Sequence, residues 1–157
     1  MGFGKVVATC YRKYAVFSGR ARRSEYWFFA LLWLPVGIVT GIVEAVSKLT
    51  DSGRMHLNET ELITLAVVSV IMSIFAIGSL LPTLAVSVRR LHDLNASGWW
   101  LLLFIALQSL PLLGILSTLA LLAWFSTRGT AGDNRFGPDP LGGSWEEQGP
   151  DQALSMD

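Results

Sequence analysis

Two short segments of this 157-residue chain concentrate arginine beside long apolar runs. Arg20, Arg22 and Arg23 precede the first run, and Arg89 and Arg90 follow the second. A guanidinium group holds a phosphate or a carboxylate through two parallel hydrogen bonds, which suits these side chains to anion binding. We therefore predict that the two segments meet and form a site for an anionic lipid headgroup.

The start of the third apolar run adds backbone donors to this candidate site. Ser97 and Gly98 stand just before the run, where the first N–H groups of a helix are free and the helix dipole favours an anion. An alternative interpretation stays open. In it, the arginines only fix the orientation of the chain in a membrane, and Trp27, Trp99 and Trp100 form an interfacial aromatic belt.

A second polar group invites a catalytic interpretation. His92 and Asp93 are adjacent, but neighbouring residues on a helix point about 100° apart, so they cannot bond to each other as a catalytic base and its orienting acid do. We expect Asp93 to pair with an arginine of the first segment instead. No zinc-protease motif, glycine-rich phosphate loop or cysteine pair occurs, so we expect no catalytic residue, no cofactor and no metal site.

A glycine- and proline-rich segment follows the third apolar run. Its polar residues Asn134, Arg135 and Asp139 join His92 and Asp93 in one polar network only if that run returns to the side on which it began. Otherwise the segment is a plain solvated turn. The path of the third run therefore decides whether the polar segments meet.

The composition indicates that most of the chain lies in a lipid bilayer. Apolar residues make up 52% and charged residues 15%, whereas soluble domains carry about 25% charged residues. Three apolar runs, about 26–47, 62–88 and 99–125, are each long enough for a membrane span. We predict an all-α, polytopic membrane helical bundle, with residues 1–140 as one membrane domain and 141–157 as an acidic, disordered tail.

The N-terminal segment predicts an amphipathic helix ahead of these spans. Apolar residues recur at spacings of three and four through residues 1–17, with cations off that stripe. Such a helix lies in the membrane interface or packs on the rest of the protein, and the sequence leaves both open. The stripe consists of Phe3, Val6, Val7, Cys10, Tyr11, Tyr14 and Phe17.

The third run contains a helix break around Pro111. We favour one kinked span over a re-entrant hairpin, and the three-span topology then leaves eight of the twelve Lys and Arg residues on the side of the N terminus. The positive-inside rule makes that side cytoplasmic. The tail lies outside in this topology, or inside if the run turns back.

Three polar segments resemble the signatures of one bacterial family. They are Phe17–Trp27, Arg89–Asp93 with Ser97–Trp100, and Gly132–Pro140. In this order they are similar to the small inner-membrane proteins catalogued as domain of unknown function 805, and the resemblance extends over residues 1–140. It implies a location in a bacterial inner membrane and no established activity.

The leading functional hypothesis is a non-enzymatic accessory or interaction protein that binds anionic membrane lipid. A small-residue pair, Gly37 and Gly41, would let a membrane protein partner or a second copy approach the first span. Two alternatives remain: a small oligomeric transporter or channel, and a lipid-headgroup enzyme with His92 as acid or base. Nothing in the sequence predicts a nucleic-acid partner.

Overall fold

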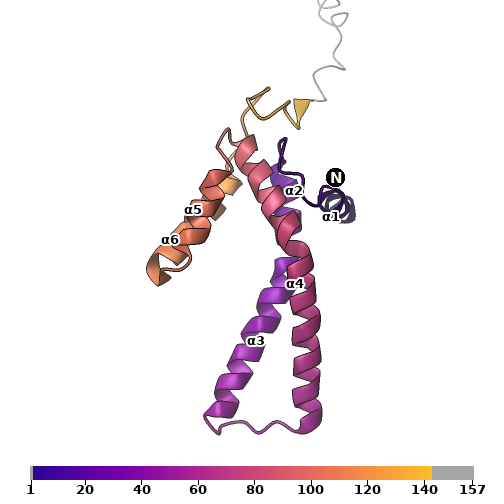
Figure 1. Ribbon diagram of the computed structural model, residues 1–157, viewed down its shortest axis with the longest axis vertical. Coiled ribbons are helices and arrows are strands. Elements are labelled where there is room, and N and C mark those ends of the chain that lie inside the picture. The colour runs from indigo at the N-terminus through magenta and orange to yellow at the C-terminus, as the bar shows by residue number, and fades with distance from the viewer. Residues whose placement is uncertain (1, 143–157) are drawn as a thin grey trace, which may run out of the picture.

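The computed structural model describes residues 2–142, and within that range the chain is helical and contains no strand (Figure 1). The all-α class predicted from the sequence is therefore correct for the described residues. The elements are α1 Phe3–Arg12, α2 Arg23–Ala30, α3 Trp33–Asp51, α4 Glu59–Asp93, α5 Trp99–Leu107 and α6 Pro111–Ser126. The predicted acidic tail lies mostly outside the described residues.

Two long helical segments run side by side. The first is α2 followed by α3, which together form a nearly continuous rod from Arg23 to Asp51, and the second is α4. Asn58 and Glu61 cap the start of α4 reciprocally through their side chains and backbone N–H groups. Both segments are long and apolar enough to cross a membrane. They extend the runs 26–47 and 62–88 at both ends.

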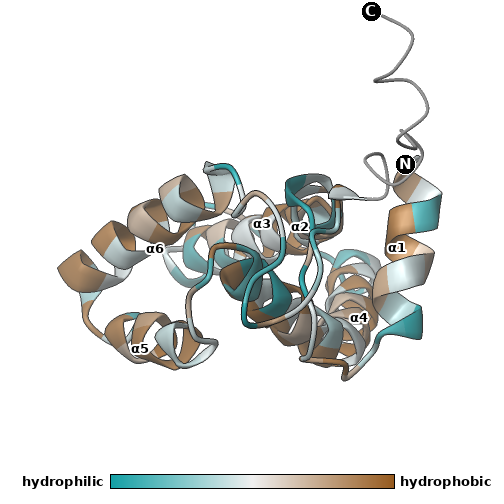
Figure 2. Cartoon of the chain, turned by 90° about the horizontal axis from the view of Figure 1, so that it is seen from above, coloured by the Kyte–Doolittle hydropathy of each residue, from teal (hydrophilic) through white to brown (hydrophobic). Residues whose placement is uncertain are grey.

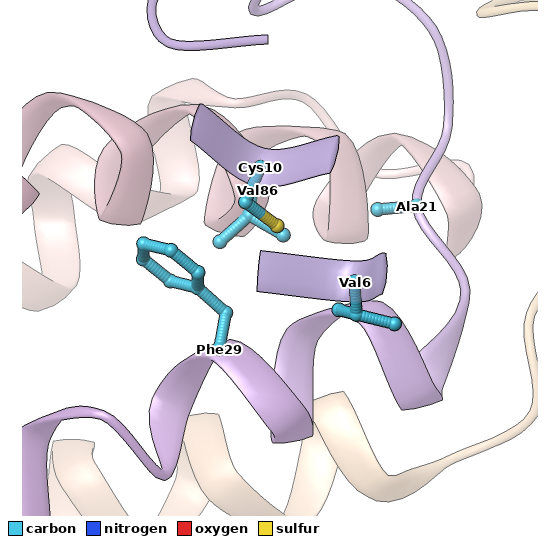
Figure 3. Close-up of a cluster of buried hydrophobic side chains, with 5 residues drawn as sticks. All are labelled: Val6, Cys10, Ala21, Phe29 and Val86. Carbon is cyan, nitrogen blue, oxygen red and sulfur yellow. The ribbon is translucent and has the colours of Figure 1, made fainter. Parts of the chain in front are cut away.

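Helix α1 lies across these two segments and packs on their upper part (Figures 1 and 2). Val6 and Cys10 are fully buried against Phe29 of α2 and Val86 of α4 (Figure 3). The helix ends at Arg12, five residues before Phe17, the last residue of the predicted stripe. Of the two arrangements left open by the sequence, the structure therefore contains the one in which the N-terminal helix packs on the rest of the protein. Contact with a lipid interface remains a prediction.

The third apolar run is a helical hairpin, which corrects the favoured expectation of a single kinked span. The break predicted near Pro111 is present, because α5 ends at Leu107 and α6 begins at Pro111. The two helices then pack antiparallel on each other, and α6 returns to the level at which α5 began (Figure 1). Pro111 removes a donor at the turn, and Gly114 brings the helices together because a Cβ there would lie 3.1 Å from the Gln108 side chain.

The glycine pair on α3 faces away from the rest of the chain. A Cβ added at Gly37 or at Gly41 would meet nothing within 4 Å among the described residues. The pair therefore serves no close contact inside the molecule. Its use in binding another helix stays a prediction.

Candidate anion site at the arginine network

Asp93, the last residue of α4, forms the centre of a buried charge network. Its Oδ1 accepts a hydrogen bond of 2.9 Å from Arg20 Nε, and its Oδ2 accepts one from Arg90 Nη1. All three side chains are at most 5% exposed. A buried charge is costly unless it is paired, so one carboxylate here neutralises part of the charge of two guanidinium groups.

Arg90 also binds the end of the hairpin. Its Nε and Nη2 donate to the carbonyl oxygen of Phe125 at 3.2 and 3.1 Å, and Nη2 donates to Thr127 O as well. The last carbonyls of a helix lack partners within the helix and carry its negative dipole end. A buried cation therefore holds the C-terminus of α6 against the C-terminal turn of α4.

Arg89 connects α4 to α2 and to the segment that follows α1. Its Nη2 forms a 2.9 Å ion pair with Glu25 of α2, and its Nη1 donates to Val16 O at 2.8 Å. Its Nε has no partner among the described residues. Burial, and next to it the Glu25 charge, raise the pKa of the neighbouring Cys10 thiol to about 11. Cys10 is therefore a neutral, packed side chain at physiological pH.

The segment after α6 crosses over the network, and we call residues 127–142 the strap. Thr130 donates its backbone N–H to Asp93 O at 2.8 Å, and Arg20 donates to the carbonyl oxygens of Thr130 and Gly132. Arg22 donates to Pro140 O at 2.6 Å. The strap therefore lies on the side of the N-terminal arginines, which the predicted single span would not have allowed.

Gly129 is required where the strap passes Asp93. A Cβ at this position would lie 2.0 Å from Asp93 Oδ2 and 2.6 Å from its Cγ, far inside any real contact. Further along, the carboxylate of Asp139 accepts backbone N–H groups of Leu141 and Gly132 at 2.8 and 2.9 Å. These two bonds, assisted by the Arg20 and Arg22 charges, lower the pKa of Asp139 below its ordinary value.

A cavity of about 770 Å³ opens between the strap, the start of α2 and the end of α4. Arg22, Arg23 and Arg128 line it together with Arg90. The acidic residues at its wall are Asp93 and Asp139. Asp93 is already neutralised from within the network, whereas Arg23 and Arg128 are exposed and Arg128 forms no hydrogen bond within the described residues. The cavity therefore favours an anion over a cation.

His92 does not line the cavity and is occupied by structural contacts. Its ring stacks on Phe136 with 3.9 Å between centroids and an interplanar angle of 4°, and Nδ1 lies 3.2 Å from Gly19 O. Asn134 donates its side-chain amide to His92 O at 2.9 Å, and Arg135 donates to Asn95 O. These contacts anchor the strap at the C-terminus of α4.

A family model identifies the chain from its sequence. Residues 14–138 match the family described as protein of unknown function, DUF805. The chain belongs to the DUF805 family. This match covers most of the described residues, the arginine network and the hairpin included.

Curated relatives place the DUF805 chain among bacterial inner-membrane proteins. It is 38% identical over 133 residues to the inner membrane protein YhaI of Escherichia coli strain K12, across 85% of this chain and 92% of the relative. It is 35% identical over 129 residues to the inner membrane protein YhaH of the same strain, across 82% and 90%. No solved structure matches the chain.

The residues predicted for the anion site fall into three groups in this DUF805 chain. Arg20, Arg89 and Arg90 are buried and hold other parts of the chain. Arg22 and Arg23 line the cavity, with Arg90 at its wall. Ser97 and Gly98 lie elsewhere: a Cβ at Gly98 would lie 2.8 Å from Val88, so this glycine serves the close packing of α5 on α4.

The predicted polar network is brought together by the returning hairpin. Asn134 and Arg135 bond to the end of α4, and Asp139 Oδ1 lies 4.0 Å from Arg20 Nη2. Sequence reasoning missed Arg128 and Gly129. Arg128 belongs to no motif or regular spacing in the sequence. The need for glycine at position 129 arises from contact with Asp93, which is distant in the chain. Only the folded path of the strap reveals either role.

Proposed function

We propose that this DUF805 protein is an accessory or interaction protein of the bacterial inner membrane that binds an anionic lipid headgroup in the arginine-lined cavity. The observation that carries the proposal is the placement of Arg22, Arg23 and Arg128 around one cavity. Arg20, Arg89 and Arg90 are each paired with a carboxylate. Arg22 and Arg23 each donate only to a carbonyl oxygen, and Arg128 forms no hydrogen bond within the described residues, so these three provide the charge available to a ligand.

The proposed topology has two spans, α2–α3 and α4, with both ends of the described chain on the cytoplasmic side. Lys48 and Arg54 then lie outside, and the other ten of the twelve Lys and Arg residues lie inside. This distribution supports the orientation more strongly than the three-span topology did, because the hairpin moves Arg128 and Arg135 to the inner side.

The cavity's position favours a lipid phosphate over a soluble one. Arg22 is the N-cap of α2 and Arg23 its first residue, so the cavity lies where the apolar segment of α2–α3 begins. In the proposed topology this is the level of the headgroups. A basic residue near an anionic membrane surface contributes about 1 kcal/mol of attraction.

The test is lipid binding by the protein purified in an uncharged detergent. Dioctanoyl phosphatidylglycerol is titrated into the wild type and into Arg22→Gln/Arg23→Gln/Arg128→Gln, with binding followed as the ligand-induced rise in Tm. Three arginines at about 1 kcal/mol each amount to about 3 kcal/mol, so we expect an increase in Kd of about 100-fold.

Controls separate the cavity from general charge and from soluble phosphate. Arg54→Gln removes one cation from the opposite end of the molecule and leaves the Kd at the wild-type value. Inorganic phosphate and dioctanoyl phosphatidylcholine raise the Tm far less than phosphatidylglycerol does. Unchanged phosphatidylglycerol binding in the folded triple variant overturns the headgroup site. A full response to inorganic phosphate overturns the lipid assignment.

A further inference from the structure

The hairpin α5–α6 exposes apolar side chains over a broad part of its surface. Residues 99–127 contain no charged residue. At about 100° per residue, the exposed large apolar side chains cover about 220° of the circumference of α5 and about 180° of that of α6. Figure 2 shows both helices mainly hydrophobic, with paler stretches between the brown ones. Six of these side chains are 47–70% exposed: Leu102, Leu103, Ile105, Leu112, Ile115 and Leu119.

Neither helix of the hairpin is long enough to cross a bilayer. At about 1.5 Å per residue, the 9 residues of α5 span about 14 Å and the 16 residues of α6 about 24 Å, against a hydrocarbon core of about 30 Å. The hairpin also ends partway along α4 (Figure 1). The hairpin is therefore too short to span both leaflets, and α5 matches the depth of one leaflet, about 15 Å.

Both ends of the hairpin are held at one level. Arg90 binds the carbonyls of Phe125 and Thr127, and Gly98 packs directly on Val88 of α4. Trp100 and Trp124, near the two ends, meet edge to face with 5.8 Å between their rings. Tryptophan is typical of the membrane–water interface, so this pair marks the level at which the hairpin enters the lipid.

Three polar side chains at the turn form hydrogen bonds inside the hairpin. Gln108 donates to the Thr118 hydroxyl at 2.9 Å, which in turn donates to Gly114 O, and the Ser109 hydroxyl donates to Ala106 O. In hydrocarbon a polar group without a partner costs several kcal/mol, whereas a turn in water needs no such internal bonding. These side-chain bonds suit an apolar surrounding.

From these observations we infer that α5–α6 is a re-entrant wedge, inserted into the cytoplasmic leaflet only and surrounded there by phospholipid acyl chains. A protein partner would cover one narrow face, whereas the exposed apolar side chains extend over half or more of the circumference of each helix. The wedge occupies area in one leaflet and none in the other. It is independent of the headgroup site, because it needs no ligand in the arginine cavity.

The experiment measures the depth of single spin labels in the protein reconstituted into phosphatidylethanolamine–phosphatidylglycerol vesicles. Leu112→Cys, at the start of α6, is labelled in a Cys10→Ala background. Collision rates with oxygen, which concentrates in hydrocarbon, and with a water-soluble nickel chelate give the depth. Ile77→Cys, 74% exposed on α4, is the hydrocarbon reference, and Met55→Cys in the loop after α3 is the aqueous one.

We expect the Leu112 label to match Ile77, with at least a several-fold higher oxygen-to-nickel ratio than Met55. A reporter fused to the C terminus, active only in the cytoplasm, is expected to be active because the hairpin returns. A nickel-accessible Leu112 label overturns the wedge, and so does a label shielded from both reagents, which would reveal a protein partner. An inactive reporter beside a deep label reveals a full span and overturns it equally.

Discussion

Replacing Asp93 by alanine tests whether the charge network holds the cytoplasmic end together. The change removes the carboxylate that accepts from Arg20 and Arg90. It leaves Arg90, 0% exposed, without its counter-charge and Arg20, 1% exposed, with only Asp139 at 4.0 Å. Breaking a buried pair by removing one partner costs about 3–5 kcal/mol, because the remaining charge stays buried. For a chain of this size that corresponds to a fall in Tm of about 10 °C.

The assay is thermal unfolding in detergent followed by tryptophan fluorescence, with limited trypsin digestion as a local readout. Arg128 and Arg135 are cleavage sites within the strap, so release of the strap should speed cleavage there well below the Tm. Asp51→Ala, an exposed carboxylate at the end of α3, serves as the matched control and should leave both readouts unchanged. If Asp93→Ala loses less than about 2 °C and its strap resists trypsin as in the wild type, the network does not stabilise this end of the protein.

Two further predictions concern single side chains around the network. Gly129→Ala forces a Cβ to within 2.0 Å of Asp93 Oδ2, so we expect a loss of Tm comparable with that of Asp93→Ala. Gly4→Ala in α1, with nothing within 4 Å of the added Cβ, should keep the wild-type Tm or exceed it slightly, because alanine favours a helix. Equal Tm values for the two variants would contradict the close approach. The Cys10 thiol, with its pKa raised to about 11, stays neutral in the folded state. The contribution of the neutral thiol to the free energy of unfolding is therefore fully present below the ordinary thiol pKa and is lost as pH rises through about 11. Iodoacetamide should label folded Cys10 far more slowly than the cysteine of the exposed variant Met55→Cys. Rapid labelling of Cys10 near pH 8 would refute its burial.

The sequence predicted the elements well and the path of the chain less well. Helical spacing and run length are local properties, so α4 and the α2–α3 segment were located within a few residues at most ends. Pro111 marked the break in the third run, but a proline allows a kink as well as a turn. The choice was made by contacts distant in sequence, above all those of Arg90 with Phe125 and Thr127.

The chemistry of the candidate site could be predicted from the sequence, but the binding partner of each arginine could not. Arginine beside apolar runs indicated anion binding, and Asp93 was expected near an arginine of the first segment, where the structure has Arg20. Which arginines are buried depends on the strap, and adjacent residues take different roles: Arg89 binds Glu25 while Arg90 binds the end of α6. Residue type and spacing do not distinguish these neighbours.

The arginines hold the strap mainly through its main chain. Arg20 and Arg22 donate to the carbonyl oxygens of Thr130, Gly132 and Pro140, and every amino acid supplies such an oxygen. The side chain of Thr130 is thus free to vary without loss of the contact, whereas an arginine replaced by lysine loses the fork that reaches two carbonyls at once. Among related chains, this end of the fold should tolerate change at Thr130, and little change at Gly129 or in the arginines that bind the strap.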